Sequence, residues 1–78
     1  MLKMNLSLKN WKPKEVIQFL MANGFVQIKI KKSGDHKCFF NKNTGAYTEI
    51  DMGKKSFSAR EMLTLSKQSK ILRAFWKK

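Results

Sequence analysis

Residues 26–52 decide the fold, and they read VQIKIKKSGDHKCFFNKNTGAYTEIDM. Three strand-like runs can be marked in this stretch, at residues 26–31, 36–41 and 46–52. Ser33-Gly34-Asp35 and Asn43-Thr44-Gly45 separate these runs, and both have the composition of tight turns. Connections this short favour an antiparallel meander of three strands.

Alternation assigns faces to the strands, because successive side chains of a strand point to opposite sides. In the first run, Val26, Ile28 and Ile30 alternate with Gln27, Lys29 and Lys31, which predicts a buried apolar face and a basic outer face. In the third run, Thr48, Ile50 and Met52 share one face, and Tyr47, Glu49 and Asp51 share the other. Of Phe39 and Phe40, one is expected in the core, and the other is open to a base or a partner.

Helices are predicted on both sides of the meander. Pro13 and Glu15 mark the start of the first helix, and Asn23-Gly24 marks its end. Ser58-Ala59-Arg60-Glu61 is a capping box that opens a second helix, which runs to about Ser69. The expected fold is a small α+β domain of order α-β-β-β-α. Both helices cover one face of a three-stranded antiparallel sheet, and the other face is open.

Length and charge restrict the possible functions. The chain has 78 residues, enough for one domain, and its 17 Lys and Arg against 5 Asp and Glu give a net charge of +12. Such a charge opposes compaction but suits a polyanionic partner. Nucleic acid is the leading candidate, and an anionic membrane surface or an acidic protein is the alternative. The single cysteine, Cys38, excludes an internal disulfide, and we expect no structural zinc, no membrane segment and a reducing, cytoplasmic setting.

The single histidine, His36, follows the turn at Gly34-Asp35 and opens the second strand. Imidazole titrates near neutral pH, so His36 is a candidate general acid or base for phosphate chemistry. Taken by itself, a lone histidine is more often structural or merely exposed. Cys38 shares its strand face, but a buried, inert thiol is the simpler interpretation of that residue.

The order of these motifs resembles the HicA toxin family. The resemblance covers roughly residues 12–71, through the helix from Pro13 to Gly24 with Phe25 after it, the Gly34-Asp35-His36 turn, the Thr44-Gly45 hairpin and the final short helix. It implies a double-stranded-RNA-binding-like fold and an mRNA endoribonuclease that a HicB antitoxin neutralises. It also implies that His36 is the catalytic residue. The family usually reads Gly-Ser-His at this turn, and here Asp35 replaces the serine.

The chemistry of metal-free RNA cleavage fits these residues. One group takes the proton of the 2′-OH, another protonates the leaving 5′-oxygen, and cations stabilise the charge on phosphorus. Because only one histidine exists, the second proton transfer falls to a lysine, Tyr47 or water. No metal and no cofactor is required. The residues predicted to bind RNA are Lys29, Lys31, Lys32, Ser33, Gly34, Lys37, Lys54 and Lys55.

The resemblance implies the function of an mRNA interferase, the toxin of a type II toxin–antitoxin system, with mRNA and a HicB-type antitoxin as partners; the basic charge of the chain leads us to expect that this antitoxin is acidic. The alternatives are a non-catalytic RNA-binding module of the same fold, with a vestigial His36, and a small DNA-binding or antitoxin-type regulator. The predicted domain spans residues 11–71, between an N-terminal extension (1–10) and a basic, aromatic C-terminal tail (72–78).

Overall fold

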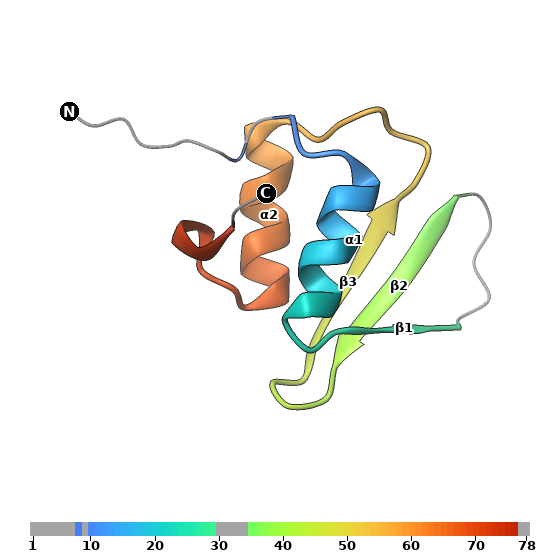
Figure 1. Ribbon diagram of the computed structural model, residues 1–78, viewed down its shortest axis with the longest axis vertical. Coiled ribbons are helices and arrows are strands. Elements are labelled where there is room, and N and C mark those ends of the chain that lie inside the picture. Colours follow the sequence, from blue (N-terminus) through green and yellow to red (C-terminus); the bar gives the residue numbers. More distant parts are fainter. Residues whose placement is uncertain (1–7, 9, 30–34, 77–78) are drawn as a thin grey trace.

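The computed structural model describes residues 8, 10–29 and 35–76 of the chain. Its elements are α1 (Pro13–Ala22), β1 (Val26–Ile28), β2 (His36–Asn41), β3 (Ala46–Asp51), α2 (Ala59–Ser69) and the 3-10 turn η1 (Arg73–Phe75) (Figure 1). This is the order α-β-β-β-α, so the predicted α+β class is confirmed. No helix in these described ranges is long and apolar enough to cross a membrane.

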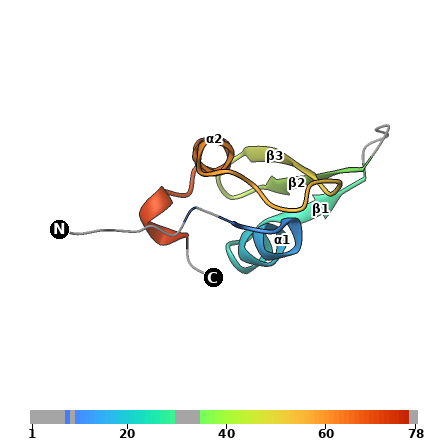
Figure 2. The same ribbon diagram turned by 90° about the horizontal axis from the view of Figure 1, so that it is seen from above.

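The three strands form one antiparallel sheet in the order β1-β2-β3. The hairpin between β2 and β3 is tight, and the Gly45 N–H donates to the carbonyl of Asn41 over 2.7 Å. Gly45 has a φ of +77°, a left-handed conformation that glycine adopts without steric cost. Figure 2 shows the sheet as a single layer, with α1 along one side of it and α2 next to β3. β3 is therefore an edge strand that faces α2.

The core lies between one face of the sheet and both helices. Phe39 and Ile50 are fully buried on this face, and they belong to the same cluster of buried residues as Val16 and Leu20 of α1 and Met62 and Leu65 of α2. Phe40 is only half-buried, so the core member of the Phe39–Phe40 pair is Phe39. The predicted arrangement, with one sheet face covered by the helices, is confirmed.

Both helices begin and end as their sequences predict. The carboxylate of Glu15 accepts the Lys12 backbone N–H over 2.8 Å at the start of α1. In α2 the capping box is reciprocal: Glu61 accepts the Ser58 N–H over 2.8 Å, and the Ser58 hydroxyl accepts the Glu61 N–H over 3.1 Å. Gly24, after α1, has a φ of +92°, the left-handed conformation expected of a helix end.

The predicted faces of the first strand are wrong. Val26 is 54% exposed, although alternation assigned it to the buried face. The cause is the register, because Val26 pairs with Phe40 and Gln27 pairs with the fully buried Phe39. Paired residues share a face, so Val26 lies on the open face of the sheet. The predicted continuation of this strand over residues 30–31 lies outside the described residues.

The two ends of the described chain pack together. Trp76 is 1% exposed, and its ring stacks on Phe19 at a centroid distance of 4.3 Å. It also meets Trp11 edge-on at 5.3 Å. Leu8 belongs to the same core. The hydrophobic core therefore reaches into both segments that the domain prediction placed outside residues 11–71, while residues 1–7, 9 and 77–78 lie outside the described part of the chain.

Candidate functional site

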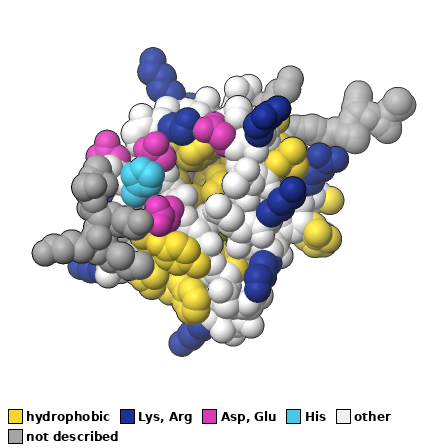
Figure 3. Space-filling model, turned by 180° about the vertical axis from the view of Figure 1, so that it is seen from behind, with side chains coloured by type: hydrophobic (Ala, Val, Ile, Leu, Met, Phe, Trp, Pro, Cys, Tyr) yellow, Lys and Arg dark blue, Asp and Glu magenta, His cyan; other side chains and the backbone are white. Residues whose placement is uncertain are grey.

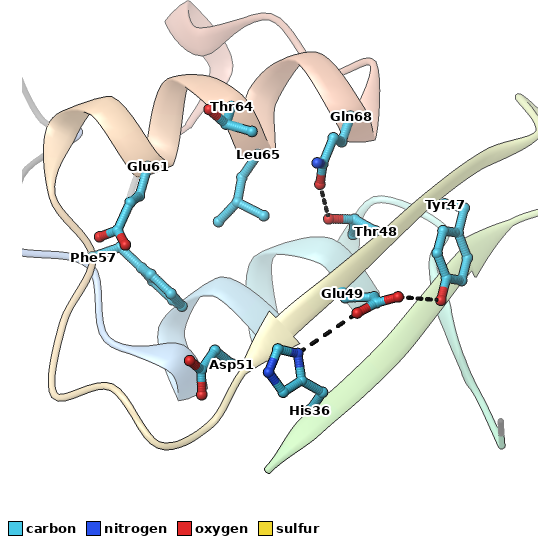
Figure 4. Close-up of a pocket in the computed structure, with 10 residues that line it drawn as sticks. All are labelled: His36, Tyr47, Thr48, Glu49, Asp51, Phe57, Glu61, Thr64, Leu65 and Gln68. Carbon is cyan, nitrogen blue, oxygen red and sulfur yellow. Dashed lines mark hydrogen bonds and ion pairs between the residues drawn. The ribbon is translucent and has the colours of Figure 1, made fainter. Parts of the chain in front are cut away.

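His36 is the first residue of β2, and its side chain is 43% exposed on the open face of the sheet. Its Nδ1 atom lies 3.6 Å from Oε1 of Glu49 on β3. This distance suits an ion pair and is longer than a well-formed hydrogen bond. Figure 4 shows the imidazole and the Glu49 carboxylate directed toward each other. The sheet thus places the Glu49 carboxylate next to Nδ1 of the His36 imidazole.

The register of β2 and β3 explains this contact. His36 pairs with Asp51, and Cys38 pairs with Glu49, so all four side chains share the open face. Glu49 is the diagonal neighbour of His36, at a separation that long side chains can bridge. The sequence already placed Glu49 and Asp51 on one strand face, but only the register shows that this face is the one that carries His36.

Tyr47 fixes the other side of Glu49. Its phenol lies 2.9 Å from Oε2 of Glu49 and 3.2 Å from Sγ of the buried Cys38. The contact with Cys38, loss of solvation and the hydrogen bond to Glu49 all raise the pKa of Tyr47 above its ordinary value of 10.0. Tyr47 is therefore a protonated donor that holds the Glu49 carboxylate in place.

An open cleft of about 470 Å³ lies beside His36, between β3 and α2. Its floor is apolar and includes Phe57 and Leu65, both of which are buried. Across its far end, the Thr48 hydroxyl donates to the side-chain carbonyl of Gln68 over 2.8 Å. The full lining is His36, Tyr47, Thr48, Glu49, Asp51, Phe57, Glu61, Thr64, Leu65 and Gln68 (Figure 4).

The charge around His36 is acidic. Of the five acidic residues of the chain, Glu49, Asp51 and Glu61 line the cleft, and Asp35 precedes His36. Carboxylate oxygens of Asp35 and Asp51 each lie 3.3 Å from the position that a β-carbon on Gly53 would take. Figure 3 shows acidic side chains around the histidine, with an apolar surface next to them. A protein of net charge +12 thus places most of its negative charge at one site.

Lys54 and Glu61 form an ion pair at the rim of the cleft, with Nζ 2.6 Å from Oε2. Lys54 first, and then the Ser58 backbone N–H, lower the pKa of Glu61 below its ordinary value of 4.5. In turn, Glu61 raises the pKa of Lys54 above its ordinary value of 10.5. Among the predicted RNA-binding residues that the structure describes, Lys54 thus stands at the rim of the cleft, paired with Glu61 of its lining.

The other predicted RNA-binding residues are differently placed. Lys37 follows His36 on the same strand, so its side chain starts toward the opposite face. Lys29 and Lys55 are exposed, at the end of β1 and in the segment between β3 and α2. Lys31, Lys32, Ser33 and Gly34 lie outside the described residues. The sequence did not indicate Phe57, Thr64, Leu65 or Gln68 as site residues, because no local pattern shows which positions of α2, or of the segment just before it, border β3.

No family model, no curated protein and no solved structure matches this chain. Over residues 8, 10–29 and 35–76, no group of three His, Cys, Asp or Glu side chains lies close enough to hold a metal ion. The site is therefore interpreted from its own geometry, as an imidazole–carboxylate pair beside an acidic cleft.

Proposed function

We propose that this protein is a metal-independent endoribonuclease that cleaves mRNA as the toxin of a toxin–antitoxin pair. The observation that carries the proposal is the pairing of His36 with Glu49, 3.6 Å apart on the open face of an α-β-β-β-α fold. An exposed imidazole beside a fixed carboxylate is suited to acid–base catalysis. The resemblance of the chain to the HicA family points to the same residue and the same activity.

The geometry suggests how the proton transfers are divided. Glu49 lies at Nδ1, which leaves Nε2 of His36 to take the proton of a 2′-OH or to protonate the leaving 5′-oxygen. Tyr47 is a poor partner for this step because its O–H contacts Glu49 and Cys38 and its pKa is raised. The second transfer therefore falls to a lysine or to water. Attack by the 2′-oxygen on phosphorus expels the 5′-oxygen, so the products are a 2′,3′-cyclic phosphate and a 5′-OH.

The net charge of +12 supports RNA as the partner. Each phosphate that lysine or arginine neutralises releases counterions, and this adds affinity without regard to sequence. Single-stranded RNA is the expected substrate because its 2′-oxygen can move in line with the scissile bond. The antitoxin is expected to be an acidic protein of the HicB type that covers both His36 and the lysines.

The test is cleavage of an end-labelled single-stranded RNA in EDTA by the wild type, by His36→Ala and by Asn43→Ala. Asn43 lies in the exposed turn between β2 and β3 and serves as the control. We expect His36→Ala to lower the rate by at least about 100-fold, the usual contribution of a general acid or base. We expect Asn43→Ala to cleave like the wild type.

Two results would contradict the proposal. Equal cleavage by His36→Ala and the wild type would remove His36 from the reaction. Binding of RNA without cleavage by any of the three proteins would favour the alternative, a non-catalytic RNA-binding module in which His36 has lost its role.

A further inference from the structure

We propose that the cleft between β3 and α2 binds one base of the RNA next to the scissile phosphate, and that it prefers guanine. This inference rests on the proposed ribonuclease function. The cleft is assigned to a base because the carboxylates of the cleft repel phosphate. An RNA strand can therefore enter the cleft only through one of its uncharged bases. His36 lines the same cleft, so a base bound there brings the adjoining phosphate to the imidazole.

The shape of the cleft suits a planar, largely apolar ring. Its volume of about 470 Å³ lies within the range of about 300–1,000 Å³ that is usual for small-ligand sites. Phe57 and Leu65 give it an apolar floor, and polar groups stand at its rim. An apolar floor with a few convergent polar groups is the usual composition of a site that binds a ring and fixes its orientation.

The polar groups of the cleft distinguish bases by the N–H donors that each base presents. A carboxylate accepts hydrogen bonds and donates none, so it favours a base edge that carries adjacent N–H groups. Guanine presents N1–H and N2–H₂ side by side, which matches the two oxygens of one carboxylate. Uracil presents a single N–H between two carbonyls, and the carbonyl oxygens are repelled by a carboxylate. Single-stranded RNA exposes these Watson–Crick edges for recognition.

Asp51 is the carboxylate that we assign to this recognition. Both oxygens of Glu61 already have partners, in Ser58 and Lys54, and both oxygens of Glu49 contact His36 or Tyr47. Asp51 accepts the Gly53 N–H on Oδ1 over 2.9 Å, which fixes the orientation of its carboxylate. It is also the cross-strand partner of His36, so a base held by Asp51 lies next to the catalytic group.

The other ligand that suits a carboxylate cleft is a guanidinium or ammonium group of a partner protein. Charge disfavours this occupant because the chain as a whole has 17 basic and 5 acidic residues, a net charge of +12. A cationic protein segment would be repelled on its approach to the cleft, whereas an RNA strand would be attracted through its phosphates. RNA fits both charges: its uncharged base can enter the acidic cleft, and its phosphates are attracted by the net positive charge of the protein.

The first experiment maps cleavage sites on an RNA that contains all four bases in equal number, with the wild type, Asp51→Asn and Glu15→Gln. The asparagine keeps an oxygen for the Gly53 N–H but replaces the second acceptor with an N–H₂ donor. Glu15→Gln is the matched control, since it also removes one negative charge but lies on α1, away from the cleft. We expect guanine next to the wild-type cleavage sites. The preference for guanine over uracil should fall at least about tenfold in Asp51→Asn. Glu15→Gln should keep the wild-type preference.

The second experiment needs no cleavage. Amide resonances of the wild type are followed during titration with guanosine monophosphate, uridine monophosphate and N-acetyl-arginine amide. We expect guanosine monophosphate alone to shift the resonances of Asp51, Thr64 and Leu65. Such binding without RNA cleavage would contradict the proposed function and leave the base site standing. Cleavage with no base preference and no binding of guanosine monophosphate would contradict the base site alone. Binding of the arginine derivative in its place would overturn the base site in favour of a protein partner.

Discussion

Glu49 is the residue that organises the site, because it contacts His36 through one carboxylate oxygen and Tyr47 through the other. Such a carboxylate determines which imidazole nitrogen is left for substrate. The sequence singled out His36, and it placed Tyr47, Glu49 and Asp51 on a common strand face. It did not indicate that these carboxylates meet the histidine, because their meeting depends on which residues of β2 and β3 pair across the sheet.

Tyr47 offers a direct test of this arrangement, since it is the only tyrosine of the chain. Its single O–H contacts both Cys38 and Glu49, and these contacts raise its pKa above 10.0, so we expect tyrosinate to form only above that pH in the folded protein. In denaturant it should form near pH ~10. Because the folded pKa is the higher one, this contribution to stability is complete below pH 10 and is lost as the pH rises further. Ultraviolet absorbance reports the ionisation, and circular dichroism shows whether the chain stays folded.

Glu49→Gln is the informative variant for this titration. It removes the negative charge near the phenol but keeps a side chain of the same size, so the pKa of Tyr47 should move back toward its ordinary value. A folded wild type that titrates like the denatured chain would show that the contacts of Tyr47 with Cys38 and Glu49 do not persist in solution.

At the scale of elements, the sequence predicted the ends of the helices correctly but not the faces of the first strand. Pro13, Gly24 and the Ser58–Glu61 box act within one helical turn, so each could be recognised without knowledge of the rest of the fold. The faces of β1 could not be assigned in the same way. Alternation shows that Val26 and Gln27 point to opposite sides, but pairing with Phe39 or Phe40 decides which side is buried.

The start of α2 carries a stability that depends on pH. Glu61 has a lowered pKa because of Lys54 and Ser58, so its contribution is complete above its unfolded value of 4.5 and is lost as the pH falls through the folded pKa. Lys54 has a raised pKa, so its contribution is lost only as the pH rises above 10.5. We therefore expect Glu61→Gln to be less stable than the wild type at neutral pH, and the difference to shrink below about pH 4.5.

Urea unfolding at several pH values measures this difference. Arg60→Gln, at the neighbouring exposed position, is the control for a change of charge on the same turn and should show no such convergence at low pH. A Glu61→Gln protein that differs from the wild type by the same amount at acid and neutral pH would contradict the role given to the carboxylate.

At the scale of the whole molecule, the charge is divided between two regions. Four of the five acidic residues lie at or beside the cleft, and among the described residues no lysine or arginine belongs to its lining, although Lys54 stands at its rim. If the protein binds RNA as proposed, cations outside the cleft would hold the phosphates. Composition indicated a polyanionic partner but not this division, because Glu49, Asp51 and Glu61 meet only when α2 packs beside β3.

Trp11 and Trp76, near the two ends of the described residues, pack together, and this packing can be tested. Trp11 is tied to the start of α2 by the Phe57 N–H, which donates to its carbonyl over 2.8 Å, and Trp76 closes over Trp11 and Phe19 from the other end. Trp76 is 1% exposed, whereas its neighbour Phe75 is 62% exposed. Truncation of a buried aromatic residue leaves a cavity, so we expect Trp76→Ala to lower the free energy of unfolding by about 3–5 kcal/mol.

Phe75→Ala is the matched control, and it should change the free energy of unfolding by no more than about 0.5 kcal/mol. Urea unfolding followed by far-ultraviolet circular dichroism compares the two variants without relying on tryptophan fluorescence. For a domain whose total stability is of order 5–15 kcal/mol, a loss of several kcal/mol is a large fraction of the total and moves the urea midpoint measurably. Equal effects of the two substitutions would mean that Trp76 does not belong to the core in solution, and that residues 72–78 are the tail that the sequence suggested.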